Sequence, residues 1–144
     1  MFKVGTNRSI YRDALYIRKK VFIEEQGVSK AEEIDQYEDK CQYIVGYDDN
    51  HSPIATARYR LVNNIVKVER VAVMPAQRRQ NIGQLLMQTL EKDATAKGYH
   101  HFKLGAQLHA VPFYEKLGYH IDGDIFIDAG IPHYHMKKIS KIIN

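Results

Sequence analysis

The residues that point most directly to chemistry lie in one segment, residues 68–87, where an apolar strand pattern passes through a basic turn into a helical pattern. The first-turn amides of a helix lack internal hydrogen-bond acceptors, and together with the helix dipole they attract anions. Arg78 and Arg79 add positive charge beside that turn. Gly83 lacks the Cβ that would block close approach, and Asn81 is the non-glycine residue type that best tolerates a left-handed backbone. The segment predicts a pyrophosphate site, with a helix start flanked by solvated arginines as the alternative.

The glycine spacing of this segment excludes two common phosphate sites. A Walker loop needs a glycine-rich run that ends in Lys followed by Ser or Thr, and the dinucleotide fingerprint needs three spaced glycines. The segment contains neither pattern. We therefore do not expect ATP or NAD as the anionic ligand.

Two histidines near the C-terminus raise the question of a metal. The spacing of His133 and His135 puts both side chains on one face of a strand, which is a common arrangement of metal ligands. The sequence offers no third and fourth ligand beside them. We therefore predict no metal site, and His133 becomes a candidate for lining a substrate pocket.

Hydrophobic periodicity predicts the elements that must position these residues. Strand patterns cover residues 2–4, 42–47, 54–61, 65–73, 101–104, 121–128 and 132–139. Helical patterns cover residues 10–22, 81–97 and 111–117, and the acidic segment between the first helix and the second strand reads as a loop with a helical turn. In the strand over 65–73, strict alternation places Glu69, Val71 and Val73 on one face. The order of elements predicts an α+β fold with one mixed sheet.

Length and composition predict one globular domain over residues 1–144, since single cores commonly fill about 100–200 residues. Hydrophobic residues make up 44% and charged residues 26% of the chain, which is ordinary for a globular protein. No apolar run approaches the roughly 18 to 20 residues that span a bilayer, and the N-terminus lacks the apolar stretch of a signal peptide. Cys41 is the only cysteine, so no intramolecular disulfide forms. We expect a cytoplasmic protein with no membrane partner.

Charge is distributed unevenly along the chain. The formal net charge is +4, yet residues 24–39 carry seven acidic side chains and one lysine, which leaves −6 there and +10 in the rest. An acidic patch on a basic body predicts a cationic substrate and an anionic cofactor, and a solvated acidic loop is the alternative. The single-sign stripe with interleaved aromatic residues that marks nucleic-acid binding is missing, so we expect no nucleic-acid partner.

Within this order of elements, two motifs resemble those of the Gcn5-related N-acetyltransferase (GNAT) family. The run Arg78-Arg79-Gln80-Asn81-Ile82-Gly83 resembles motif A, Gln/Arg-x-x-Gly-x-Gly/Ala after a Val-rich strand, with Asn81 in place of the first glycine. The run Phe113-Tyr114-Glu115-Lys116-Leu117-Gly118-Tyr119 is similar to the family's Tyr-Glu-Lys-x-Gly-Phe/Tyr signature. Three further runs, 21–26, 104–109 and 128–133, resemble the small bacterial ElaA-like branch. The resemblance extends across nearly the whole chain.

The resemblance implies an α/β/α sandwich whose mixed, mostly antiparallel sheet splays between its fourth and fifth strands, with acetyl-CoA wedged in the split. Residues 65–73 and 101–104 would be those strands. The backbone of 71–73 would pair with the pantetheine amides like an added strand, and the amides of 80–84 would hold the pyrophosphate. Gln107 stands where many members carry a cofactor-binding asparagine. The cofactor-binding residues implied in this way are Val71, Ala72, Val73, Arg78, Arg79, Gln80, Asn81, Ile82, Gly83, Gln84, Gln107 and Phe113.

The same resemblance assigns the proton donor. Tyr114 matches the family position of the general acid, whereas without the motif it would be read as a core residue. A phenol with a pKa of about 10 is protonated at neutral pH and can protonate a leaving thiolate whose parent pKa is about 8.5. The backbone amide of Val73 is a candidate oxyanion donor.

Glu69 is our candidate for the catalytic base. An alkylamine with a pKa of about 10.4 is mostly protonated at neutral pH, so a carboxylate helps to remove its proton. Glu69 shares the strand face of Val71 and Val73 in the alternation and lies one step toward the substrate end. An ion pair of Glu69 with Arg70 or Arg58 and a chain of water molecules as the base are the alternatives.

The acceptor site is expected beside the end of the first helix, which borders it in this family. The residues implied there are Arg18, Glu24, Glu25, Gln26 and His133. The acidic side chains would favour a cationic amine, so the expected partner is a small-molecule or peptide amine. The expected reaction is direct transfer of an acetyl group in a ternary complex. A CoA-binding regulatory domain without turnover and a transferase of longer acyl groups are the alternatives, and exposed strand edges leave a monomer or a homodimer open.

Overall fold

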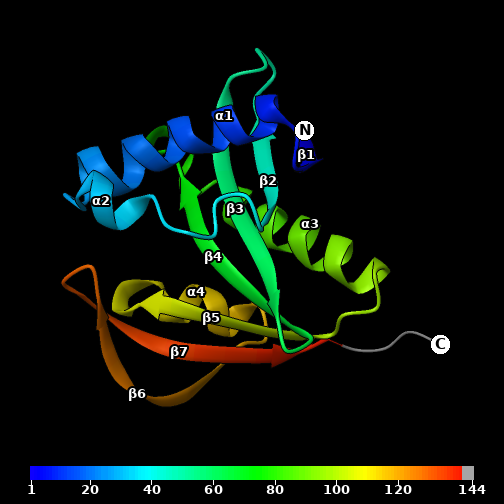
Figure 1. Ribbon diagram of the computed structural model, residues 1–144, viewed down its shortest axis with the longest axis vertical. Helices are drawn as coiled ribbons and strands as arrows, with labels where there is room; N and C mark the ends of the chain where they lie inside the picture. The colour runs from blue at the N-terminus through cyan, green and yellow to red at the C-terminus, as the bar shows by residue number, and fades with distance from the viewer. Residues whose placement is uncertain (141–144) are drawn as a thin grey trace.

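The computed structural model describes residues 1–140, which form one mixed sheet with helices on both faces (Figure 1). The strands are β1 (Phe2–Gly5), β2 (Gln42–Tyr47), β3 (Pro53–Val62), β4 (Ile65–Val73), β5 (His101–Gln107), β6 (His120–Asp128) and β7 (Ile131–Ile139). The α-helices are α1 (Arg8–Arg18), α2 (Lys30–Glu33), α3 (Ile82–Ala96) and α4 (Val111–Lys116). A π-helix, η1 (Lys19–Glu25), and two 3₁₀ turns, η2 (Pro75–Gln77) and η3 (Leu108–Ala110), complete the described elements.

The sheet has the order β1-β2-β3-β4-β5-β7-β6 and divides between β4 and β5. The first four strands form an antiparallel meander, and β5, β7 and β6 form a second antiparallel group. Strands β4 and β5 are parallel and pair only from Val66↔Phe102 to Val68↔Leu104. Figure 1 shows the two groups diverging beyond that point toward the side where α2 and the β6–β7 turn lie. The splayed α+β sheet expected from the sequence is thereby confirmed.

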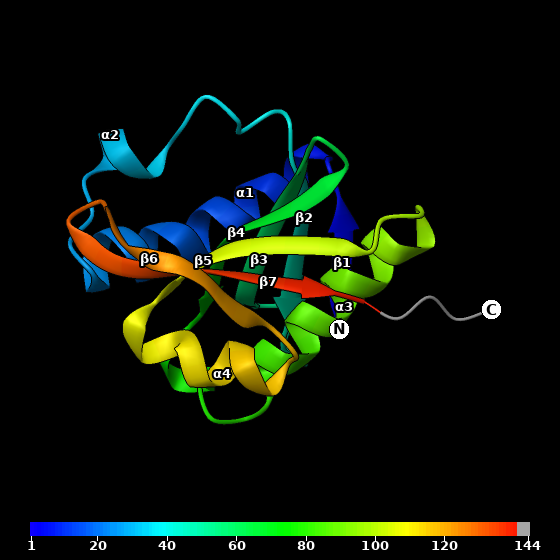
Figure 2. The ribbon, with the colours of Figure 1, turned by 90° about the horizontal axis from the view of Figure 1, so that it is seen from below.

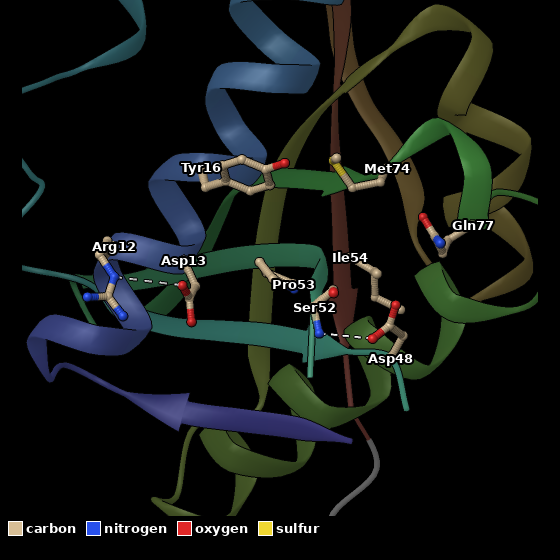
Figure 3. Close-up of a pocket in the computed structure, with 9 residues that line it drawn as sticks. All are labelled: Arg12, Asp13, Tyr16, Asp48, Ser52, Pro53, Ile54, Met74 and Gln77. Carbon is tan, nitrogen blue, oxygen red and sulfur yellow. Dashed lines mark hydrogen bonds and ion pairs between the residues drawn. The ribbon is translucent and has the colours of Figure 1, made fainter. Parts of the chain in front are cut away.

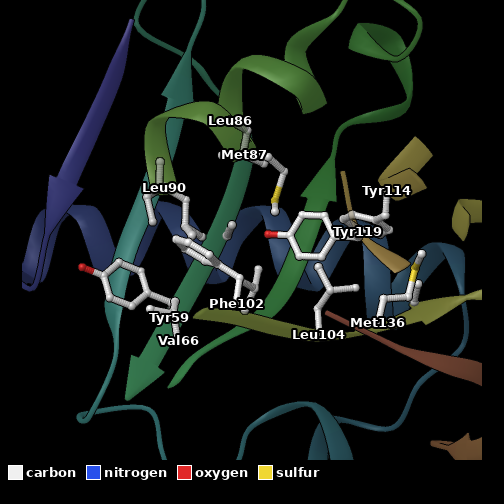
Figure 4. Close-up of a cluster of buried hydrophobic side chains, with 14 of the residues drawn as sticks. Tyr59, Val66, Leu86, Met87, Leu90, Phe102, Leu104, Tyr114, Tyr119 and Met136 are labelled. Carbon is white, nitrogen blue, oxygen red and sulfur yellow. The ribbon is translucent and has the colours of Figure 1, made fainter. Parts of the chain in front are cut away.

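Two apolar clusters hold the helices against the sheet. Figure 2 shows α1 and α2 on one side of the sheet and α3 and α4 on the other. The larger cluster lies under α3 and α4 and reaches across both halves of the sheet through side chains such as Val66, Phe102 and Met136 (Figure 4). The smaller cluster packs α1 against the opposite face of β2. Because the larger cluster spans β4 and β5, it joins the two strand groups at the closed end of the split.

Short-range signals in the sequence set the ends of several elements. The Asn7 side chain accepts a hydrogen bond from the backbone N–H of Ile10 and caps α1, as expected from the polar residues there. Asn63 and Asn64 both have positive φ, 53° and 66°, which suits the tight turn between β3 and β4. The helix expected over 10–22 begins as an α-helix and continues as the π-helix η1.

A β-bulge in β4 changes the expected arrangement of faces. Arg70 has a φ of 56°, and the register against β3 shifts between Thr56 and Arg58, so β4 contains one extra residue there. Val71 and Val73 therefore pack toward the α3–α4 cluster. Glu69 precedes the bulge and faces the α1 side. The prediction that Glu69 shares a face with Val71 and Val73 is wrong, because strict alternation does not continue through the bulge.

No helix within residues 1–140 is long and apolar enough to cross a membrane.

Candidate active site

A long cleft follows the split between β4 and β5. Its volume is about 1810 Å³, and it extends from the β3–β4 turn past the diverging strands to the start of α3. Residues of η1, β4, β5, α4, β6 and β7 line it. Most of the residues predicted for the cofactor, including Val71–Val73, Arg78 and Gln107, line this cleft together with Tyr114. The structure therefore brings the predicted cofactor and proton-donor residues into one space.

The start of α3 forms the anion-binding end of the cleft. Asn81 adopts the expected left-handed conformation, with a φ of 61°, and its side chain makes no capping hydrogen bond within the described chain. The first-turn amides of this 15-residue helix are therefore free of a side-chain cap. A Cβ on Gly83 would lie 3.1 Å from the Phe113 ring and 3.8 Å from Val73 Cγ2. Gly83 thus permits close packing of Phe113 over the helix start, a contact that the sequence did not predict.

Arg78 connects the cofactor end of the cleft to η1. Its guanidinium donates two hydrogen bonds of 2.6 Å to the Glu25 carboxylate, and its Nε donates to the Val73 carbonyl at 3.0 Å. The hydrogen bond lowers the pKa of Glu25 and raises the pKa of Arg78, because each partner stabilises the other's charged form. About 40% of each side chain is exposed, so solvent screens the pair. Arg79, which also lines the cleft, has a φ of 67°.

Beyond the last β4–β5 pair, the edge of β4 that faces the cleft is open. Register pairing with β5 stops at Val68, while the opposite edge of β4 remains paired with β3 up to Ala55↔Val73. An amide-containing ligand can therefore add to this edge as a strand does. At the end of β5, the Gln107 side chain donates a 2.9 Å hydrogen bond to the Gln26 side chain. That bond connects a predicted cofactor residue with a predicted acceptor residue across the split.

Tyr114 lies on α4 and is 7% exposed. Its ring makes edge contacts with Phe113 and Tyr119, with ring centroids 5.0 and 5.8 Å apart. Burial raises the pKa of Tyr114 well above its ordinary value, because the phenolate would lose its hydration. The hydroxyl therefore stays protonated at neutral pH and can donate a hydrogen bond or a proton into the cleft.

Glu69 lies in an ion-pair cluster. Its carboxylate accepts hydrogen bonds of 3.1 Å from Arg58 Nη2 and from Arg60 Nε, and Lys67 Nζ lies 3.9 Å away. The two arginine hydrogen bonds occupy this carboxylate within the folded sheet. The sequence alternative of an ion pair with Arg58 describes the observed contact, and Arg60 is a partner that the sequence analysis missed. Arg58 and Arg60 are two positions apart on β3, with the buried Tyr59 between them, and so share one strand face; this spacing is the signal that could have identified Arg60.

The acidic segment is largely neutralised by arginines. Arg18, 1% exposed, donates to the Glu33 carboxylate at 2.6 and 3.0 Å and to the Glu38 carboxylate at 2.7 and 2.9 Å. Burial alone would raise the pKa of Glu38, but hydrogen bonds from Arg18 and from the backbone of Asp35 hold that pKa well below its usual range. Arg58, fully buried, also pairs with Asp35 and Glu38. We call the set Arg18, Glu33, Asp35, Glu38, Arg58, Glu69 and Arg70 the arginine–carboxylate network.

Two predicted acceptor residues have other roles. Arg18 is buried in the arginine–carboxylate network, so the prediction that it binds substrate is wrong. Glu24 is half-exposed and pairs with Lys20 one helical turn away at 3.3 Å, which is an ordinary surface contact. Glu25, Gln26 and His133 do line the cleft.

His133 lies in the cleft wall opposite Gln107 in the β5–β7 register. Its Nδ1 is 2.7 Å from the Ile131 carbonyl, and because a carbonyl only accepts, Nδ1 carries the proton of the neutral ring. Nε2 is then the ring's proton acceptor. The Phe126 ring stacks on His133 and on His135, with centroids 5.3 and 3.9 Å apart, so the two histidines flank an aromatic ring. Within residues 1–140 no group of three or more His, Cys, Asp and Glu side chains is placed to hold a metal.

A second hollow of about 470 Å³ lies between α1 and the β2–β3 turn (Figure 3), and Gln77 lines both this hollow and the cleft. Asp48 accepts hydrogen bonds from the backbone of Asn50 and Ser52 and so shapes this turn. Asp13 accepts a 2.6 Å hydrogen bond from the Tyr47 hydroxyl. The two carboxylates of this hollow thus support local structure.

Comparison with known proteins identifies the fold. The family profile of the acetyltransferase (GNAT) domain matches residues 11–140. YjcF of Bacillus subtilis, an uncharacterised N-acetyltransferase, is 40% identical over 136 residues, which cover 94% of this chain and 96% of YjcF. The crystal structure of Escherichia coli ElaA superposes with a TM-score of 0.85 at 25% identity over 96% of this chain and 98% of ElaA. An aminoglycoside 6'-N-acetyltransferase complexed with coenzyme A shares the fold, with a TM-score of 0.76 at 19% identity over 96% of each chain.

The splayed sheet is that of the acyl-CoA N-acyltransferases. The chain belongs to the GNAT family of acetyltransferases, and its likeness to ElaA confirms the branch indicated by its sequence motifs.

Proposed function

We propose that the protein transfers an acetyl group from acetyl-CoA to a primary amine by direct attack in a ternary complex. Family membership carries the class of reaction. The observation that supports the cofactor is the cleft itself, in which the open edge of β4 leads to the uncapped start of α3. The pantetheine arm would lie along Val71–Val73, and the pyrophosphate would bind the first-turn amides of α3 beside Arg79.

In the proposed reaction the amine nitrogen attacks the thioester carbonyl, a C–N bond forms, and the C–S bond then breaks. The Val73 N–H would stabilise the oxyanion, and Tyr114 would donate to the leaving sulfur. The raised pKa of Tyr114 makes it a steady hydrogen-bond donor at neutral pH. Because Glu69 is held by two arginines, we assign the amine proton to Nε2 of His133, directly or through water.

Direct transfer is also supported by the state of the only cysteine. Cys41 is 4% exposed, and its thiol donates to the Tyr37 carbonyl at 3.2 Å. Burial raises the pKa of Cys41 to about 11, so the thiolate needed for an acetyl-enzyme intermediate is scarce at neutral pH.

Isothermal titration of acetyl-CoA and of free CoA tests the cofactor site. Replacing Arg78 and Arg79 together by Ala should weaken binding by roughly 100-fold or more, since two charge-assisted hydrogen bonds of about 1.5–3 kcal/mol each are removed. Lys92→Ala, on an exposed position of α3, is the matched control and should bind as the wild type does. Absence of acetyl-CoA binding by the wild type would refute the proposal.

Release of CoA thiol over a panel of amines tests turnover. Tyr114→Phe should lower kcat by about 100-fold or more while leaving CoA affinity within about twofold, because only the proton donor is removed. Tight binding without thiol release over the whole panel would favour the regulatory CoA-binding domain. Faster release from longer acyl-CoA thioesters would correct the acyl group.

A further inference from the structure

A row of cationic side chains crosses the sheet on the face opposite α3. Arg60 on β3 pairs in register with Lys67 on β4, Lys67 with Lys103 on β5, and Lys103 with Lys137 on β7. Residues that pair across strands point to the same face of a sheet, so these four side chains are neighbours. Like charges placed side by side on a sheet destabilise it. We call these four residues the basic row; mutual repulsion within it opposes folding, and only part of that repulsion is offset by neighbouring carboxylates.

The basic row lies in the cleft. Arg60, Lys67 and Lys103 line it. Their chain neighbours Val66, Val68, Phe102 and Leu104 point the other way, into the cluster under α3 and α4. The row is therefore on the face of the sheet opposite α3, which is the face where we expect the acceptor. On β5, Lys103 precedes Gln107 by four residues, which corresponds to about 13 Å along a strand.

Few carboxylates are available to neutralise the row. Glu69 is bonded to Arg60 and Arg58, and its distance to Lys67 Nζ is 3.9 Å. Within residues 1–140, Lys103 has no carboxylate at ion-pair distance, while Lys137, outside the cleft lining, has Asp122 at 3.6 Å. Lys67 and Lys103 thus present two ammonium groups to the cleft with little compensating charge.

Cationic side chains also outnumber acidic side chains in the lining of the whole cleft. Seven Lys and Arg side chains and five Asp and Glu side chains line it. Three of those five carboxylates, Glu25, Glu33 and Glu69, are already bonded to arginines. Arg60, Arg70 and Arg78 are among the seven cations and are themselves bonded to carboxylates, which leaves Lys67, Arg79, Lys103 and Lys116 beside Glu32 and Asp128.

We propose that the acceptor is an amine that also carries an anionic group, a carboxylate or a phosphate, and that Lys67 and Lys103 bind this group. The inference rests on the proposed function, because it needs the amine to sit where β4 and β5 diverge. The distance of about 13 Å along β5 from Lys103 to Gln107 fits an acceptor that is an extended peptide of at most about four residues, or another molecule of similar length. Lysine side chains are flexible, so the ammonium groups of Lys67 and Lys103 can bind a carboxylate or a phosphate through the same charge-assisted hydrogen bonds.

Matched acceptor pairs test the inference. One pair is a tripeptide with a free amino terminus and a free carboxylate against the same tripeptide amide, and the other is an aminoalkyl phosphate against the corresponding amino alcohol. We expect the wild type to prefer one anionic member by about tenfold in kcat/KM. Lys67→Gln with Lys103→Gln should abolish that preference through KM, with kcat and CoA affinity unchanged. Lys92→Gln is the control.

A charge reversal and a binding measurement make the test decisive. Lys103→Glu should shift the preference from the anionic member toward the neutral member of the same pair. Titration of each acceptor into the CoA-bound protein gives a readout that does not depend on turnover. Equal affinity for anionic and neutral members would overturn the inference while leaving acetyl transfer intact. Failure of CoA binding in the same samples would instead refute the proposed function.

Discussion

Removing the Arg18 guanidinium should destabilise the fold by about 3–5 kcal/mol, because it leaves a buried carboxylate without its main partner. The Glu33 side chain is 2% exposed, and after Arg18→Met its nearest remaining cation is Arg70 Nε at 3.6 Å, beyond hydrogen-bond distance. Glu38 is less affected, since Arg58 still donates to it at 3.0 Å. For a chain of this size the loss corresponds to a fall in Tm of roughly 6–20 °C.

A double-mutant cycle separates two contributions to the free energy of unfolding: the Arg18–Glu33 interaction itself, and the cost of leaving one of the two charges buried without a partner. Glu33→Leu should cost less than Arg18→Met, because Arg18 keeps two hydrogen bonds to Glu38. The double variant should be more stable than the sum of the single effects predicts by about 2 kcal/mol, since it leaves no buried charge at Glu33. Urea unfolding followed by circular dichroism, with the slope checked for each variant, gives the three free energies. Arg12→Met, which is 76% exposed, is the control and should change stability by no more than about 0.5 kcal/mol. Additivity within about 0.5 kcal/mol would refute the reasoning.

Three further predictions concern the cleft. Glu25→Gln frees Arg78 from its carboxylate partner and should tighten acetyl-CoA binding by up to about fivefold, which is the largest effect expected of an exposed ion pair. Titration calorimetry measures this change, and weaker binding by the variant would contradict the prediction. Gly83→Ala places a Cβ 3.1 Å from the Phe113 ring, so acetyl-CoA should bind several-fold more weakly with little change in Tm. Because burial raises the pKa of Tyr114, its contribution to stability is full below its unfolded value near 10 and is lost as pH rises through the folded value. Melting curves from neutral pH to about pH 10.5 should show this loss in the wild type and less of it in Tyr114→Phe, and kcat/KM should show no alkaline limb from Tyr114 below about pH 10.

The fold was predictable from sequence because its elements carry regular periodicity and explicit end signals. The strands along the chain and the long helix α3 followed from such patterns, whereas the split between β4 and β5 was implied by the resemblance to the GNAT family. The left-handed conformation of Asn81 followed from its residue type. The bulge at Arg70 was not predictable, since arginine gives no signal for a positive φ. This one extra residue in β4 makes the side chains after it, such as Val71 and Val73, point to the opposite face from the one that strict alternation predicts.

The pairing of charges was also beyond the sequence, because it depends on strands far along the chain. Seven acidic residues within 24–39 suggest a cation site when read alone. Arg58 comes from β3 and Arg70 from the bulge of β4, and both reach Asp35 in that segment. Only the folded sheet brings them together.

This pairing decides what the acidic segment does. The bulge turns Val71 and Val73 toward the α3–α4 cluster and leaves Glu69 and Arg70 on the α1 side, where they join the network that holds α2 and its loop. To reach Glu33, Asp35 or Glu38, a cationic group would have to displace Arg18 or Arg58, both almost fully buried. The loss of a buried ion pair would cost more than an exposed contact returns. Glu33, Asp35 and Glu38 therefore tether α2 and its loop to the sheet, and in our proposal Lys67 and Lys103 select among acceptors.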